Sequence, residues 1–108
     1  AMRGSVGNSA YAASKAALAG YVGTLAAETA RRGVTVNYVA PGFIDTEMMA
    51  PYAARREQLE RQIPLGRFAA PEEIAALVGF LLSPQAGYIT GVTIPVDGGL
   101  SGALPILR

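Results

Sequence analysis

The period of hydrophobic and polar positions changes along the chain, and the changes predict alternating helices and strands. Small and apolar residues dominate residues 10–32, which predicts one long helix. A β-branched run bounded by Gly33 and Pro41 follows it and predicts a buried strand over residues 34–40. A long helix leading into a buried strand is typical of an α/β fold.

The rest of the chain continues this alternation. Proline followed by two glutamates at residues 71–73 predicts the start of a helix, where the acids complement the helix dipole, so we assign them to helix initiation and not to catalysis. The predicted elements are a charged connecting segment over residues 41–66, a helix over residues 71–83, a strand over residues 89–96 and a tail over residues 97–108. The predicted buried face of the 71–83 helix consists of Ile74, Leu77, Val78, Leu81 and Leu82.

Composition narrows the chemistry that the chain can perform. It contains no cysteine and no histidine, which excludes disulfides, thiolate or imidazole metal sites and histidine-based triads, so we expect no metal site. The net charge of +1 indicates no nucleic-acid partner. No apolar run approaches the roughly 20 residues needed to cross a bilayer. We therefore expect a cytoplasmic protein without a membrane partner.

A stripe of small residues runs along the first predicted helix. Glycine in a helix interior costs about 1 kcal/mol relative to alanine, so Gly20 and Gly23 call for a close packing partner. With 51% hydrophobic residues in 108, the chain also has apolar surface to cover. We expect a homo-oligomer formed through this helix and the apolar faces. The stripe consists of Ala16, Gly20, Gly23, Ala27 and Ala30.

Tyr11 and Lys15 are the strongest candidates for chemistry. Four residues apart on a helix, they lie on one face. A phenol with a pKa near 10 becomes a useful acid at neutral pH only when a nearby cation stabilises its phenolate, and an ammonium group one turn away is placed to do so. The alternative is an aromatic ring packed under a lysine stem, which the spacing alone does not exclude.

Four motifs in order along the chain resemble one known family. The chain is similar to the C-terminal half of a short-chain dehydrogenase/reductase, in the branch of the 3-oxoacyl-carrier-protein reductases and glucose dehydrogenases. The resemblance covers roughly 100 residues, a density that chance motif matches do not reach. The motifs are Tyr11-Ala12-Ala13-Ser14-Lys15, Asn37 to Thr46, Pro64 to Ala75, and Tyr88 to Gly99.

The resemblance implies an α/β fold that forms the C-terminal half of a doubly wound, Rossmann-type parallel sheet, in one unit over residues 1–108. The family's glycine-rich turn for the cofactor pyrophosphate does not occur in this sequence. The family's catalytic serine, thirteen residues before the tyrosine, falls ahead of Ala1. We therefore expect the N-terminal dinucleotide-binding half to be absent from this chain.

The resemblance also assigns roles to individual residues. It implies hydride transfer between NAD or NADP and a small-molecule carbonyl or alcohol, in which Tyr11 protonates the carbonyl oxygen. Lys15 lowers the phenol pKa and holds the nicotinamide ribose. The segment from 41 to 66 resembles the family's substrate lid. The remaining cofactor-binding residues are Pro41, Gly42 and the backbone of Ile44 at the nicotinamide, and Thr46 near its amide or the pyrophosphate.

Three functions remain open from the sequence. In the first, the chain is part of an NAD(P)-dependent oxidoreductase, and alone it binds cofactor weakly or not at all and reduces no carbonyl. In the second, it is a cofactor-independent acid/base or hydrolytic enzyme that reuses Tyr11 and Lys15. In the third, it is a non-catalytic self-associating domain. Neither the substrate nor the choice between NAD and NADP can be read from these residues.

Overall fold

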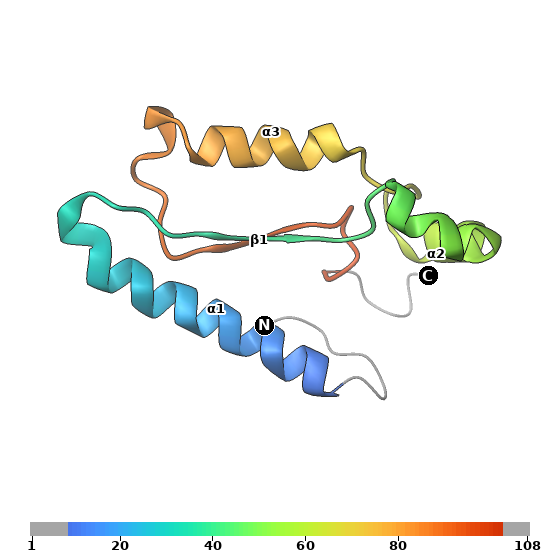
Figure 1. Ribbon diagram of the computed structural model, residues 1–108, viewed down its shortest axis with the longest axis horizontal. Helices are drawn as coiled ribbons and strands as arrows, with labels where there is room; N and C mark the ends of the chain where they lie inside the picture. Colours follow the sequence, from blue (N-terminus) through green and yellow to red (C-terminus); the bar gives the residue numbers. More distant parts are fainter. Residues whose placement is uncertain (1–8, 103–108) are drawn as a thin grey trace. The chain divides into compact units, whose positions relative to one another are not determined.

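The computed structural model describes residues 9–102, in which helices alternate with strands as in other α/β proteins. Figure 1 follows them from α1 in blue to the last strand in orange. Residues 103–108, which belong to the predicted tail, lie outside the described part. The elements are α1 (Ser9–Thr29), β1 (Tyr38–Pro41), α2 (Arg56–Gln62), α3 (Pro71–Leu81) and β2 (Thr93–Val96), with 3₁₀ turns η1 (Ala30–Arg32), η2 (Glu47–Arg55) and η3 (Pro84–Ala86).

Contacts group the described residues into two compact units, where the sequence predicts one. The first unit holds the residues up to Val39 together with Leu81–Ile94. The second holds Ala40–Phe80 together with the residues from Pro95 onward. Tyr11 and Lys15 therefore belong to the first unit, and the predicted cofactor segment from Pro41 to Thr46 belongs to the second.

The first helix follows from its alanine-rich sequence, since alanine has the highest helix propensity. The α-helical part ends at Thr29 and tightens into η1, where the prediction continues a single helix to residue 32. Gly33 ends it with φ +75°, a left-handed conformation that glycine adopts without steric cost, and its N–H donates to the Ala30 carbonyl at 2.9 Å. Val22 and Ala26 form the buried side of α1.

The two strands pair in parallel but are shorter than predicted. The Tyr38 N–H donates to the Val92 carbonyl at 2.9 Å, and the Gly42 N–H donates to the Val96 carbonyl at 3.0 Å. Before Tyr38, side chains form hydrogen bonds with backbone groups of the opposite segment. The Asn37 amide donates to the Ile89 carbonyl at 3.2 Å and accepts from the Val92 N–H at 3.3 Å.

Thr90 contributes in the same way. Its hydroxyl accepts from the Val36 N–H at 3.0 Å, and the Gly91 N–H donates to the Val36 carbonyl at 2.8 Å. Because these side chains satisfy backbone groups that a regular ladder would otherwise pair, the strands begin at Tyr38 and Thr93 and not at residues 34 and 89.

The core of the second unit is formed mostly by residues of the connecting segment over residues 41–66. Leu59, Ile63 and Phe68 are buried, and Met49 packs against them. Phe43 also packs there, and its ring stacks on that of Phe68 with centroids 5.3 Å apart and planes at 19°. Offset stacking of this kind adds about 0.5–1.5 kcal/mol beyond the area that it buries.

The third helix is capped at its start and exposed along much of its length. The Glu73 carboxylate accepts from the Ala70 N–H at 2.9 Å, so this acid caps the helix, in agreement with its predicted role. The helix ends at Leu81, short of the predicted residue 83. Ser83 is extended (φ −89°, ψ 160°), as expected for a residue before a proline.

The predicted buried face of α3 is wrong in part. Ile74, Leu77 and Leu81 are half-buried, but Val78 is 40% exposed and Leu82 is 82% exposed. Periodicity identifies residues that share a helix face, but it does not tell how much of that face the chain covers.

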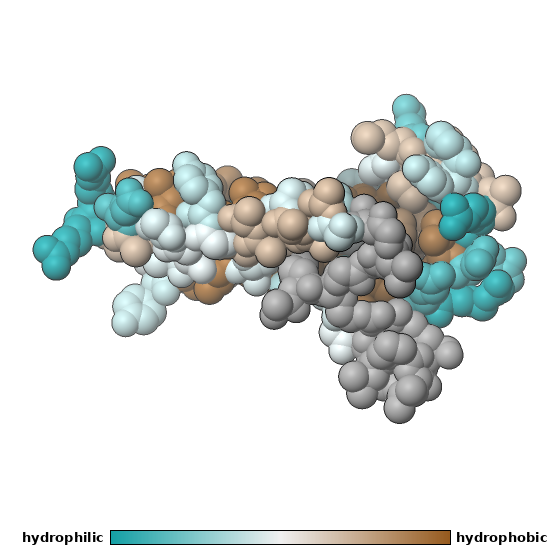
Figure 2. All heavy atoms as spheres, turned by 90° about the horizontal axis from the view of Figure 1, so that it is seen from below, coloured by the Kyte–Doolittle hydropathy of each residue, from teal (hydrophilic) through white to brown (hydrophobic). Residues whose placement is uncertain are grey.

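Apolar side chains remain exposed in both units. In the view of Figure 2, brown hydrophobic residues reach the surface beside teal hydrophilic ones. Gly20 and Gly23 also face open space, since within the described part of the chain no atom outside their own helix lies within 4 Å of a Cβ built on either. The apolar surface that the composition predicts is therefore present on the described chain. The most exposed large hydrophobic residues are Tyr21, Met48, Leu65, Leu82 and Tyr88.

Candidate functional site

Tyr11 and Lys15 meet on one face of α1, as their spacing predicts. The Lys15 ammonium lies over the Tyr11 ring, with Nζ 5.1 Å from the ring centroid, within the range of a cation–π interaction. Tyr11 is 54% exposed and Lys15 is half-buried, so the phenol is open to a reactant while the cation stays beside it. This pair could donate a proton to a bound carbonyl oxygen.

The environment of Lys15 favours its charged form. The Tyr11 side chain is the largest cause that raises the pKa of Lys15, and the Tyr38 side chain adds to it, while partial burial acts in the opposite direction. Tyr38, the first residue of β1, was not among the predicted site residues. No spacing signal marks it, because it meets Lys15 through the fold and not along one helix.

The predicted cofactor segment leaves the end of β1. Pro41 is exposed at the end of this strand, and Gly42 pairs with Val96 by the hydrogen bond described above. Ile44 forms a parallel bridge with Ala69. Ligands in open parallel sheets bind beyond the carboxyl ends of the strands, and this segment occupies such a position.

Thr46 has a hydroxyl that its own helix does not use. It occupies the N-cap position of η2 in an extended conformation (φ −134°, ψ 167°), yet its side chain makes no capping hydrogen bond. The residue is exposed. Threonine at this position usually caps the following turn, so a hydroxyl that does not is available to a ligand.

Asp45 and Arg56 join the segment to α2. Arg56 donates two hydrogen bonds to the Asp45 carboxylate, at 3.0 and 3.1 Å, and these lower the pKa of Asp45. The guanidinium also lies over the Phe68 ring, 4.4 Å from its centroid. Arg56 also lies 3.5 Å from Glu60, one turn along α2. No pattern in the sequence marks Asp45 or Phe68 as a partner of Arg56.

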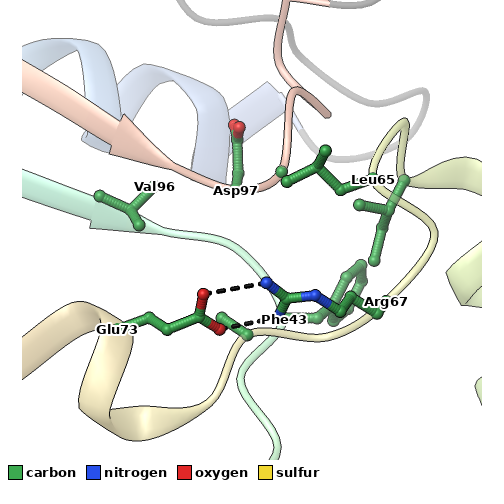
Figure 3. Close-up of a pocket in the computed structure, with 9 residues that line it drawn as sticks. Phe43, Leu65, Arg67, Glu73, Val96 and Asp97 are labelled. Carbon is green, nitrogen blue, oxygen red and sulfur yellow. Dashed lines mark hydrogen bonds and ion pairs between the residues drawn. The ribbon is translucent and has the colours of Figure 1, made fainter.

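A small pocket lies inside the second unit (Figure 3). Its volume is about 90 Å³, below the roughly 300–1,000 Å³ of typical ligand sites. In Figure 3, Arg67 and Glu73 point toward one another, and two hydrogen bonds of 2.7 and 2.9 Å join them. The bonds from Arg67, together with the Ala70 N–H, lower the pKa of Glu73 to about 2. The two charges at this pocket, those of Arg67 and Glu73, are therefore already paired with each other.

Asp97, on the rim of the same pocket, organises the turn that follows β2. Its carboxylate accepts from the Gly99 N–H at 3.0 Å and from the Ser101 N–H at 3.1 Å. Partial burial acts to raise the pKa of Asp97, but hydrogen bonds from Ser101 and from the Gly99 and Leu100 backbone outweigh it and lower the pKa. The carboxylate points away from Arg67 and Glu73 in Figure 3. Asp97 therefore stabilises this turn.

Two findings concern other kinds of site. Residues 9–102 hold no group of three or more histidine, cysteine, aspartate or glutamate side chains arranged to bind a metal ion. None of the helices in the same range is long and apolar enough to cross a membrane.

Comparisons with known proteins relate the chain to one family. A family model described as Enoyl-(Acyl carrier protein) reductase matches residues 1–101. The chain is 54% identical over 98 residues to the 3-oxoacyl-(acyl-carrier-protein) reductase FabG of Pseudomonas aeruginosa, covering 90% of this chain and 40% of the relative. It is 45% identical over 107 residues to the short-chain reductase protein NovJ of Streptomyces niveus, covering 92% and 41%.

A solved structure shows the same arrangement. A double mutant of a short-chain dehydrogenase/reductase from Serratia marcescens superposes with a TM-score of 0.81 at 45% identity, over 93% of this chain and 41% of that one. The predicted α/β fold, matching part of a Rossmann-type sheet, is confirmed. The chain spans about 40% of the length of the curated relatives named above.

Proposed function

The chain belongs to the short-chain dehydrogenase/reductase family, and on this basis we propose that it carries the catalytic acid and the nicotinamide end of an NAD(P)-dependent oxidoreductase site. The observation that carries the proposal is the Lys15 ammonium, held 5.1 Å over the Tyr11 ring in an environment that raises the lysine pKa. A fixed cation beside an exposed phenol is the arrangement that proton transfer to a carbonyl needs.

In this proposal the Tyr11 hydroxyl donates its proton to the oxygen of a carbonyl substrate, and Lys15 stabilises the phenolate that remains. The nicotinamide cofactor, when bound, supplies the hydride that adds to the carbonyl carbon, so that the product is an alcohol. The reverse reaction takes the hydroxyl proton back to Tyr11. Lys15 also holds the nicotinamide ribose, through donors on the same ammonium group.

The strand-end segment fits the other part of the cofactor. Pro41 is the last residue of a parallel strand, and Gly42 and Ile44 follow it, where the resemblance to the family implies the nicotinamide ring. The exposed hydroxyl of Thr46, which does not cap its own helix, is suited to the carboxamide or the pyrophosphate. The names of the relatives make a 3-oxoacyl thioester the first substrate to test.

One observation also favours self-association. Tyr21, Leu18 and the open face at Gly20 put unpartnered apolar and small residues on α1. We keep a homo-oligomer through α1 as part of the proposal, and a non-catalytic self-associating domain as the alternative to it. The cytoplasmic location predicted from the sequence stays a prediction.

The test joins this chain to the part of the Pseudomonas aeruginosa relative that precedes the matched region, a protein called the completed enzyme below. We expect the completed enzyme to bind NADH or NADPH and to reduce a 3-oxoacyl thioester or another small carbonyl. We expect the isolated chain to bind either cofactor weakly and to reduce none. A folded completed enzyme that binds no nicotinamide cofactor would contradict the proposal. Turnover by the isolated chain without cofactor would favour the cofactor-independent alternative.

A further inference from the structure

Arg56 has more partners than a surface arginine needs. Its guanidinium donates to both Asp45 oxygens at 3.0 and 3.1 Å, approaches Glu60 at 3.5 Å, and lies 4.4 Å from the Phe68 ring centroid. A planar guanidinium that is bidentate to a carboxylate and stacked on a ring is fixed in orientation as well as in position. Arg56 therefore holds Asp45 in one place.

Stability does not account for this arrangement. The Arg56 side chain is 37% exposed and that of Asp45 is 55% exposed, and ion pairs open to water contribute little to folding. The same helix offers a comparison. Arg61 reaches Glu57 at 3.4 Å, one turn away on the same helix, with both side chains largely in solvent. Only one of the two arginine pairs on α2 reaches back to the residues after β1.

Asp45 lies between Ile44 and Thr46. Its backbone and its carboxylate each link it to residues 68–69. Its N–H donates to the Ala69 carbonyl at 2.8 Å, and the Ala69 N–H donates to the Phe43 carbonyl at 2.9 Å. Its carboxylate binds Arg56, which rests on Phe68. The backbone bonds and Arg56 together hold the segment at Asp45, and the next residue, Thr46, has a hydroxyl that does not cap its own helix.

We propose that Arg56 is a positioning residue for cofactor binding: through Asp45 it fixes the segment that presents Ile44 and Thr46 to the nicotinamide end of the cofactor. This inference rests on the proposed function. Arg56 itself touches no reacting atom. By holding the segment in one conformation before the cofactor binds, Arg56 reduces the conformational entropy that is lost on binding. This preorganisation increases the affinity for the cofactor.

The experiment measures the dissociation constant for NADH or NADPH in the completed enzyme, by cofactor fluorescence, beside the melting temperature without cofactor. We expect Arg56→Gln to weaken binding about tenfold, because a loosened segment has to be ordered again when the cofactor binds, at a cost of about that size in affinity. Arg61→Gln is the matched control and should leave both the dissociation constant and the melting temperature unchanged. Arg56→Lys keeps the charge but loses the bidentate fork, and it should weaken binding about threefold.

A double-mutant cycle with Asp45→Asn separates positioning from a general loss of structure. If Arg56 acts through Asp45, the double variant binds no more weakly than Arg56→Gln alone, whereas independent effects multiply. Unchanged cofactor affinity in folded Arg56→Gln or Arg56→Lys, or independent effects in the cycle, would overturn the inference while the proposed function stands. Absence of cofactor binding by the unaltered completed enzyme would overturn both.

Discussion

Gly42 lies directly against Asp97. A Cβ built on Gly42 would stand 2.8 Å from the Cβ of Asp97 and 3.0 Å from its Cα, closer than real Cβ atoms come to such neighbours. The Gly42 N–H donates to the carbonyl of Val96, the residue before Asp97. The ends of the two strands are therefore in direct backbone contact at this point. The fold therefore has its own requirement for glycine at residue 42, separate from any contact with a cofactor.

We predict that Gly42→Ala destabilises the chain by about 1–3 kcal/mol, because an added methyl group has to displace backbone and not a flexible side chain. Gly79 is the matched control, since a Cβ there meets no atom within 4 Å. Gly79→Ala should stabilise α3 by about 0.5–1 kcal/mol through helix propensity. Denaturant unfolding at one fixed chain concentration measures both. Equal stability of the two variants would show that the strand ends do not approach as described.

Much of the fold could be predicted because it depends on local patterns. The hydrophobic periodicity identifies the helices, together with Gly33 at the end of the first and Pro71 at the start of the third. The alternation of helices and strands identifies the α/β class. The strand lengths could not be predicted, because they depend on Asn37 and Thr90. Their side chains replace backbone ladder bonds with residues more than fifty positions away, and composition carries no signal for that.

The candidate site divides in the same way. The Tyr11 and Lys15 pair could be predicted, since i and i+4 residues meet on any helix. Tyr38 beside Lys15 and Asp45 beside Arg56 could not, because their partners come together only when separate elements pack. The role of Glu73 as a helix cap could be read from the proline and acids at the start of α3. Its partner Arg67 lies before the helix, and no spacing or composition signal in the sequence pairs it with Glu73.

The open face of α1 leads to a prediction about assembly. Apart from its own helix, no atom of residues 9–102 lies within 4 Å of a Cβ built on Gly20, so a larger residue can begin there without meeting a neighbouring element. We expect Gly20→Leu to keep or raise the helix content, measured by circular dichroism, and to lower the oligomeric state, measured by sedimentation. Gly79→Leu makes the same change on α3 and should leave assembly intact. If the unaltered chain is monomeric, or Gly20→Leu assembles normally, this face is not the interface.

Glu73 predicts a dependence of stability on pH. Its pKa falls from 4.5 to about 2 in the folded chain, since the ionised carboxylate is bound by Arg67 and the Ala70 N–H. A depressed carboxyl pKa stabilises the fold above the unfolded value and loses that contribution as the pH falls toward the folded value. The advantage of the unaltered chain over Glu73→Gln should therefore be largest near neutral pH and shrink steadily below about pH 4.5.

Melting temperatures over a pH series test this expectation. Glu72→Gln is the matched control, because it removes the same charge from the same first turn of α3 but leaves the bonds to Arg67 and Ala70 in place. Its difference from the unaltered chain should be the smaller of the two. A Glu73→Gln difference that does not change with pH would show that the ion pair does not form in solution.

The last prediction separates the two roles assigned to the Tyr11 and Lys15 pair in the completed enzyme. Tyr11→Phe removes the proton donor but not the cation, so kcat should fall at least about 100-fold while the affinity for NAD(P)H changes little. Tyr21→Phe removes a hydroxyl from another exposed tyrosine of α1 and should leave both quantities unchanged.

Lys15→Ala should lower kcat and weaken cofactor binding together, because one ammonium group interacts with both the phenolate and the ribose. Steady-state rates and a cofactor titration on the unaltered enzyme and on each variant measure both quantities. A completed enzyme that is indifferent to Tyr11→Phe, or a Lys15→Ala variant that binds cofactor normally, would show that the roles are assigned to the wrong residues.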